Sequence, residues 1–214
     1  AIIGNGTVRT EVPDALPPAA TLEFSTDNGK LDLNGKDQTI AGIIDVGKKG
    51  FIQSETPATL TVNQNDNTTF AGRLTGAVNL LKTGSGTLTL SNNLSTTTGD
   101  ITVSEGTLAV ALENSLGNST NITVSGAAAR LELRASSGIA DTAALKIAND
   151  GAKVNLLAGV GETVGWLYLG GKMQRAGTYG SASSGAIHKD ATHFSGTGIL
   201  TVLHDQSGTL VSVR

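Results

Sequence analysis

The sequence lacks cysteine, so neither disulfide bonds nor a thiolate metal site can contribute to its stability. Its 214 residues include only 4 prolines, 2 tyrosines and 1 tryptophan. Charged residues make up 15% of the chain, below the roughly 25% usual in globular domains. The 15 lysines and arginines are scattered, which argues against nucleic acid as a partner, and no apolar run is long enough for a transmembrane helix.

Glycine and threonine dominate what is present, with 28 of each. Threonine favours strands because its β-branched side chain has restricted rotamers, and glycine permits the positive φ angles of tight corners. The apolar fraction of 38% is too high for a disordered chain. The composition therefore predicts an all-β protein built from short strands and turns.

A short unit recurs along the chain: a small residue followed by alternating apolar and polar residues. Gly86–Leu90 reads Gly-Thr-Leu-Thr-Leu, so a strand here buries Leu88 and Leu90 and exposes Thr87 and Thr89. Other copies begin at residues 20, 29, 58, 106, 129, 152 and 198. Their spacing, often close to 20 residues, suits successive coils of a β-solenoid better than a sandwich of hairpins.

A single strand of this kind cannot bury its apolar face alone. Stacked about 4.8 Å apart, such strands would satisfy each other's backbone groups and align their inward side chains, and about ten coils would make a rod on the order of 50 Å long. We therefore predict one elongated domain. It has a lead-in or cap at 1–19, coils at 20–203 with a carboxyl-terminal element at 164–203, and a strand or tail at 204–214.

Two segments interrupt the alternation. Leu112–Leu116 and Asp141–Ile147 are each expected to form a helical turn or a short helix at a corner, with Asp141 as an acceptable N-cap. Glu11–Ala19 holds three of the four prolines and is expected to be extended.

Three stretches carry a family resemblance. Residues 67–72 read NTTFAG, residues 81–90 read LKTGSGTLTL, and residues 101–108 read ITVSEGTL. Together they resemble the autotransporter-associated β-strand repeat, and residues 167–202 resemble a terminal element of large bacterial surface proteins. The resemblance implies a right-handed parallel β-helix that is carried outside the bacterial cell as a passenger, stalk or adhesin-like rod.

No catalytic, cofactor-binding or metal-binding residue stands out. His188 and His193 lie in a stretch rich in Gly and Ser, and a metal or catalytic site would need a further rigid ligand, so a polar surface loop is the simpler interpretation. The stretches 27–29 and 63–67, rich in Asp and Asn, suit turns, although such oxygen ligands also bind calcium in some β-solenoids. No Gly-x-Ser-x-Gly elbow marks a nucleophilic serine.

The rare aromatic residues cluster near the carboxyl terminus. Trp166, Tyr168 and Tyr179 are the candidate carbohydrate contacts, because their rings could form a platform for a sugar. The alternative is that they plug the open end of the solenoid core. The exposed threonine rows likewise could bind carbohydrate or another ordered surface, or could simply keep a strand face soluble.

From these observations we predict a non-catalytic extracellular structural protein of a bacterial surface: a stalk, an adhesin-like rod or a self-assembling fibre subunit. Its expected partners are another copy of itself, joined end to end through free strand edges, and a cell-surface or matrix polysaccharide. No enzyme activity and no cofactor are expected. The alternative is a carbohydrate-binding or polysaccharide-degrading protein on the same scaffold.

Overall fold

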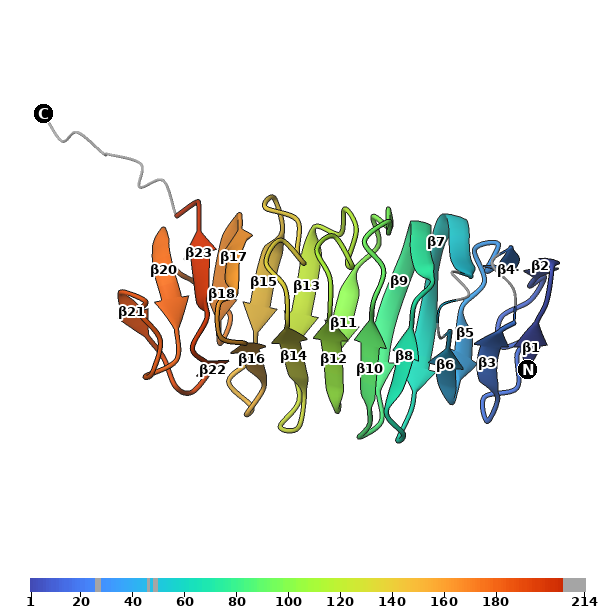
Figure 1. The fold of residues 1–214 in the computed structure, drawn as a ribbon, viewed down its shortest axis with the longest axis horizontal. Helices are drawn as coiled ribbons and strands as arrows, with labels where there is room; N and C mark the ends of the chain where they lie inside the picture. The colour runs from blue at the N-terminus through green and yellow to red at the C-terminus, as the bar shows by residue number, and fades with distance from the viewer. Residues whose placement is uncertain (26–27, 46, 48–49, 206–214) are drawn as a thin grey trace, which may run out of the picture.

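The protein is a stack of short parallel strands in the computed structural model, which describes residues 1–25, 28–45, 47 and 50–205. The strands coil into a β-solenoid of about seven turns, and Figure 1 shows them side by side along one axis. The described residues contain no helix. The predicted all-β solenoid is confirmed, but the expected ten coils are too many, because only Trp166–Leu169 within residues 157–193 continues a long parallel stack before the chain reverses.

Two long stacks of strands build the body of the solenoid. The first is a ten-stranded sheet. It contains β2 (Gly6–Arg9), β4 (Gly29–Asp32), β5 (Gln38–Ile40), β7 (Phe51–Asn63), β9 (Arg73–Thr83), β11 (Ile101–Val103), β13 (Asn121–Val124), β15 (Ala144–Ile147), β18 (Trp166–Leu169) and β19 (Lys172–Met173). The long strands β7 and β9 pass a corner, where their register shifts between Ser54 and Ala58.

The second stack consists of two sheets joined by an isolated bridge between Asp45 and Phe70. The first sheet contains β1 (Ile2–Ile3), β3 (Thr21–Phe24) and β6 (Gly42–Ile44). The second contains β8 (Thr68–Phe70), β10 (Thr87–Leu90), β12 (Thr107–Val110), β14 (Arg130–Leu133), β16 (Lys153–Leu156) and β22 (Phe194–Gly196). A further small sheet holds β17 (Gly161–Val164), β23 (Ile199–Val202), β20 (Gly177–Gly180) and β21 (His188–Lys189).

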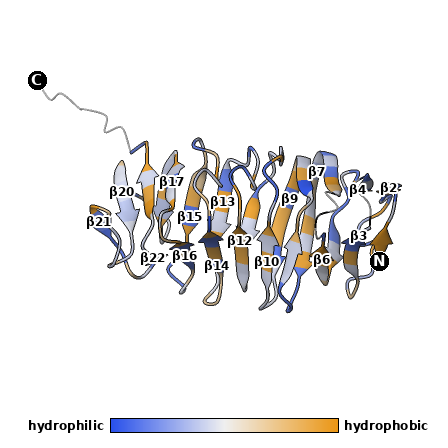
Figure 2. Ribbon diagram, viewed as in Figure 1, coloured by the Kyte–Doolittle hydropathy of each residue, from blue (hydrophilic) through white to orange (hydrophobic). Residues whose placement is uncertain are grey.

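The predicted alternation sets the register from coil to coil. Leu88 pairs with Leu108, which pairs with Leu131, at intervals of 20 and 23 residues. All three side chains are buried, whereas Thr87 and Thr89 are partly exposed as expected. Figure 2 shows the resulting mixture of apolar and polar positions along each strand. Burial of each such leucine stabilises the fold by roughly 1.5–3 kcal/mol, so the inward columns supply most of the favourable free energy.

Glycine at the corners lets one coil approach the next. Gly84 and Gly106 have φ angles of 73° and 63°, a conformation that other residues rarely adopt. A Cβ atom added at Gly106 would also lie 2.3 Å from the backbone oxygen of Gly84 in the preceding coil. The glycine of the recurring unit is therefore required both by backbone conformation and by close stacking.

The expected helix at Asp141–Ile147 is wrong, and Leu112–Leu116 forms turns but no helix. Ala144–Ile147 is strand β15, with Leu145 and Ile147 buried and paired with Ile122 and Val124 of the coil before. Residues 113–118 form turns, in which Asn114 adopts a φ of 53°. Parallel pairing gives the residues of β15 backbone partners on both sides and a buried face, which a helix of one or two turns could not provide.

The stack begins and ends differently. Strands β1 and β2 pair with β3 and β4, so the stack starts within residues 1–19. At the other end the chain leaves β16 and returns 40 residues later, where Phe194 pairs with Val154. Between them, β18 and β19 form an antiparallel hairpin and β20 lies antiparallel to β23. We call residues 157–193 the cap; of the predicted 204–214 tail, residues 206–214 lie outside the described part.

Candidate binding surfaces at the carboxyl-terminal end

Tyr179 is part of the apolar core, not of an exposed platform. It lies on β20 with only 4% of its surface exposed, and its hydroxyl donates a hydrogen bond to the backbone oxygen of Arg175 at 2.9 Å. Burial raises the pKa of this hydroxyl, with the Arg175 contacts opposing the shift. The ring of His188 stacks on Tyr179 with 4.6 Å between their centroids, so Tyr179 lies beneath His188 and not at the surface of the cap.

Trp166 and Tyr168 lie on the outer side of β18, where alternation places them either side of buried Leu167. Trp166 contacts the ring of His204 at a centroid distance of 4.8 Å. Tyr168 lines a groove of about 300 Å³ together with Thr123, Lys146, Ile147, Ala148 and Gly171. The two partly exposed rings therefore share one strand face, and Tyr179 is separate from them.

The groove beside Tyr168 ends an outward column of side chains. Paired positions from β5 to β18 place the following residues in one row: Thr39, Thr61, Leu81, Thr102, Thr123, Lys146 and Tyr168. Leu81 interrupts the threonines, so the row is not a uniform hydroxyl array. Lys146 donates a hydrogen bond from Nζ to Asn121 Oδ1 at 3.1 Å, which holds the lysine beside the groove.

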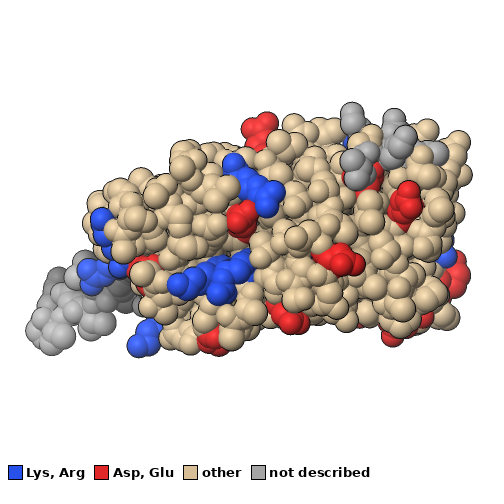
Figure 3. Space-filling model, turned by 60° about the horizontal axis from the view of Figure 1, so that its bottom comes forward, with Lys and Arg blue, Asp and Glu red and all other residues tan. Residues whose placement is uncertain are grey.

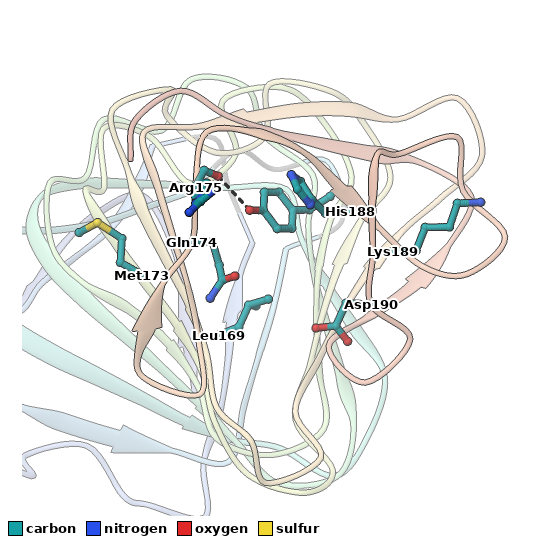
Figure 4. A pocket seen from close by; sticks show the side chains of 8 residues that line it. Leu169, Met173, Gln174, Arg175, His188, Lys189 and Asp190 are labelled. Carbon is teal, nitrogen blue, oxygen red and sulfur yellow. Dashed lines mark hydrogen bonds between the residues drawn. The ribbon is translucent and has the colours of Figure 1, made fainter. Parts of the chain in front are cut away.

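A second cavity opens on the cap. It has a volume of about 440 Å³ and lies between the β18–β19 hairpin and strands β20 and β21. Its walls are formed by Leu169, Met173, Gln174, Arg175, Tyr179, His188, Lys189 and Asp190, most of them drawn in Figure 4. We call it the cap pocket. Its volume is within the range of about 300–1,000 Å³ typical of small-molecule sites.

His193 is not in a polar surface loop, so that prediction is wrong. It is 6% exposed, and its Nδ1 lies 2.6 Å from Asp190 Oδ2 while its Nε2 lies 2.6 Å from Asn149 Oδ1. Burial raises the pKa of the Asp190 carboxyl, but hydrogen bonds and charge from His193 outweigh this and leave the pKa below its usual value. Asn149 fills the place at Nε2 where a nucleophile would have to lie, so this group anchors the cap to the coil before it.

Two buried ionisable groups were not identified from the sequence. Lys82 points inward from β9, with no exposed surface, and donates from Nζ to the backbone oxygens of Thr83 and Gly84 at 2.6 and 2.7 Å. Burial lowers the pKa of Lys82 to about 8, and the charge of Glu105 partly opposes this. Because Lys82 ties together backbone oxygens at a corner, its role in the coil is structural.

Glu162 is the second such group and lies on β17, within the cap. It is fully buried, and its carboxylate accepts hydrogen bonds from the amides of Gly138 and Thr163 at 2.9 and 3.1 Å. Burial raises the pKa of Glu162 to about 7; hydrogen bonds from backbone amides lower it, and the charge of Asp141 raises it further. No group of three His, Asp or Glu side chains able to hold a metal occurs in the described part of the chain.

Comparison with protein families adds one finding. Residues 80–110, which hold Lys82 and strands β10 to β12, match the model of the passenger-associated-transport-repeat. The comparisons with curated proteins and with solved structures give no match. Within the described residues there is no helix of the length and apolar character needed to cross a membrane.

Proposed function

We propose, from the passenger-associated transport repeat that this chain carries on its parallel β-solenoid, that the protein is a non-catalytic structural rod of a bacterial surface. The repeat and the fold fit an autotransporter passenger domain, which suggests a secreted or surface protein. The observation that supports a mechanical role is the unbroken stack of parallel strands from β8 to β22. Such a stack gives length and rigidity without disulfides, because every coil bonds to two neighbours.

The interior supports the same role. Buried polar side chains act as braces between coils: Gln64 donates from Nε2 to the backbone oxygens of Asp66 and Thr87 at 3.0 and 2.8 Å. Of the buried side-chain nitrogens and oxygens that the structure describes, Ser119 Oγ alone has no hydrogen-bond partner. Charged side chains are sparse over the face seen in Figure 3, which favours a scaffold over a charged catalytic cleft. Local opening, which proteases need, is therefore costly along the stack.

Two measurements test the proposal: the location of the protein on or in the cell, and its activity on polysaccharides. Antibody labelling of intact cells that express the whole gene product should detect the chain outside, and added protease should leave the solenoid uncut. Leu108→Asp, which places a carboxylate in the core, should abolish this resistance, whereas Thr107→Asp on the outer face should preserve it. Confinement of the wild type to the cell interior, or hydrolysis or lyase activity on a polysaccharide panel, would overturn the proposal.

A second candidate function is carbohydrate binding, favoured by the groove beside Tyr168 and by Trp166 on the same strand face. Aromatic side chains offer large, rigid contact surfaces. On a glycan array, Tyr168→Ala and Trp166→Ala should each remove binding. Thr61→Ala, in the same outward row but far from the groove, is the matched control and should leave binding intact. Identical array profiles for all three variants and the wild type would exclude this surface.

A further inference from the structure

The wall of the cap pocket contains two positively charged side chains that are available to a ligand and one negatively charged side chain that is not. Arg175 and Lys189 line it and are exposed, and neither forms an ion pair with any residue in the described part of the chain. Arg175 lies close enough to Tyr179 for its charge to affect that hydroxyl. Lys189 reaches only a backbone oxygen, that of Ala182, at 3.3 Å.

The one acidic side chain in the wall does not cancel these charges. Both carboxylate oxygens of Asp190 are already bound: Oδ2 by the ring of His193, and Oδ1 by the amides of Thr192 and His193 at 2.8 and 3.1 Å. An anion entering the pocket therefore meets Arg175 and the exposed ring of His188, with the ammonium group of Lys189 farther out near Ala182, whereas the carboxylate of Asp190 is already bound by His193 and Thr192.

The rest of the wall suits a compact ring bearing hydroxyl groups. Leu169 and Met173 provide an apolar side, and the exposed ring of His188, which stacks on buried Tyr179, provides a flat one. Gln174 donates from Nε2 to the backbone oxygen of Lys172 at 2.8 Å, and this bond leaves its Oε1 as an acceptor in the wall. Figure 4 shows Gln174 and Leu169 below Arg175 and His188.

We propose that the cap pocket binds a sugar residue that bears a carboxylate, as in an acidic polysaccharide built from uronic acids. The guanidinium of Arg175 pairs with the carboxylate, for which its planar fork is suited. His188 donates to the neighbouring hydroxyls, the charge of Lys189 adds to the attraction for the anion, and the pyranose ring rests against Leu169 and His188. This inference deepens the carbohydrate-binding candidate by assigning a ligand class to a second site, and it does not depend on the rod function.

Calorimetric titration of the whole chain with trigalacturonate and with the neutral galactotriose tests the proposal. The acidic trisaccharide should bind measurably and the neutral one at least about tenfold more weakly, since hydrogen bonds to charged groups are the strong ones. Arg175→Gln should weaken trigalacturonate binding by about tenfold or more. Lys172→Gln is the matched control, because Lys172 is exposed on the same hairpin outside the pocket, and it should change nothing.

Three results would overturn the site: equal binding of the acidic and neutral sugars, no effect of Arg175→Gln in a variant with unchanged thermal midpoint, or tighter binding of an acetylated dipeptide carboxylate than of the sugar. Tyr168→Ala separates this site from the groove on β18. It should leave trigalacturonate binding intact, and a parallel loss would assign the acidic sugar to the groove instead.

Discussion

The two ends of the solenoid differ in how their outermost strands are paired and covered. At the amino-terminal end, β1 and β2 each pair with one strand, all four residues of β2 are exposed, and Ile2 and Val8 are 71% and 41% exposed. At the carboxyl-terminal end the chain reverses direction, so that antiparallel strands cover the last coil and Tyr179 and Phe194 are buried.

The difference shows what a parallel stack needs in order to stop. Every coil exposes a row of unpaired backbone groups to the next one, and a further parallel strand only moves this row along the axis. At the carboxyl-terminal end the outermost strands, β19 and β21, are only two residues long, so few backbone groups of this row remain unpaired there. The carboxyl-terminal end of the described stack is thus covered by the chain itself, whereas β1 and β2 each have one strand partner among the described residues.

The largest expected effect compares one apolar side chain from each end. Phe194→Ala removes a buried ring that joins the cap to β16 and should lower the free energy of unfolding by about 3–5 kcal/mol. Ile2→Ala, at an exposed position, should change it by less than about 0.5 kcal/mol. Urea unfolding followed by circular dichroism measures both. Equal losses would mean that the two ends are equally well packed.

A second prediction uses Glu162 as a pH probe of the covered end. Burial raises the pKa of Glu162 to about 7 in the folded protein, whereas the carboxyl has a pKa near 4.5 in the unfolded chain. Between these two pH values the folded protein keeps the proton and the unfolded chain has released it. Stability from this group is therefore full below about pH 4.5 and is lost as the pH rises through about 7, by up to about 3 kcal/mol.

Glu162→Gln should remove this dependence, so that the variant gains stability over the wild type between pH 4.5 and 7.5. Glu23→Gln is the control, because Glu23 is exposed on β3 near the other end and should leave the pH profile unchanged. Thermal unfolding across this pH range gives the comparison. A wild-type profile that runs parallel to that of Glu162→Gln would contradict it.

The smallest change in fold stability is expected from placing a charge on β2, whose four residues are exposed. If chains associate through strand edges, the contact should begin at the amino-terminal end, and Val8→Lys should prevent it by placing a lysine on β2. Leu203→Lys, an exposed position at the covered end, should not. Light scattering after gel filtration at high concentration distinguishes them. Association that survives Val8→Lys and is lost in Leu203→Lys would place the contact at the carboxyl-terminal end and contradict the prediction.

The regular coils were predictable because their information is local. In Gly86–Leu90 the period of two residues marks the buried side, and the same pattern recurs where the next coil must stack. The corner glycines were predictable for the same reason. The expected helix at Asp141–Ile147 failed because alanines make that segment locally compatible with a helix, while its neighbours Ile122 and Val124 decide in favour of a strand.

The candidate sites depend on contacts that no local pattern reveals. His193 is buried because Asn149, 44 residues earlier, receives its ring. Lys82 follows two leucines, so the alternation of apolar and polar residues does not show which of Leu80 and Leu81 faces inward. The sequence therefore does not predict that Lys82 faces inward. The aromatic residues were found as a cluster by their rarity. Only the coordinates separate Tyr179 in the core from Trp166 and Tyr168 on the outer face.

The 40-residue excursion between Val154 and Phe194 makes the cap an insertion rather than an appendage. Both of its connections, at Leu156 and at Phe194, lie on neighbouring strands, β16 and β22. A protein engineer would therefore exchange residues 157–202 as one unit, because β17 and β20 within the excursion are the two strands that pair with β23. Variation in this region is thus expected to come by replacement of the whole excursion, with the coils on its amino-terminal side left in place.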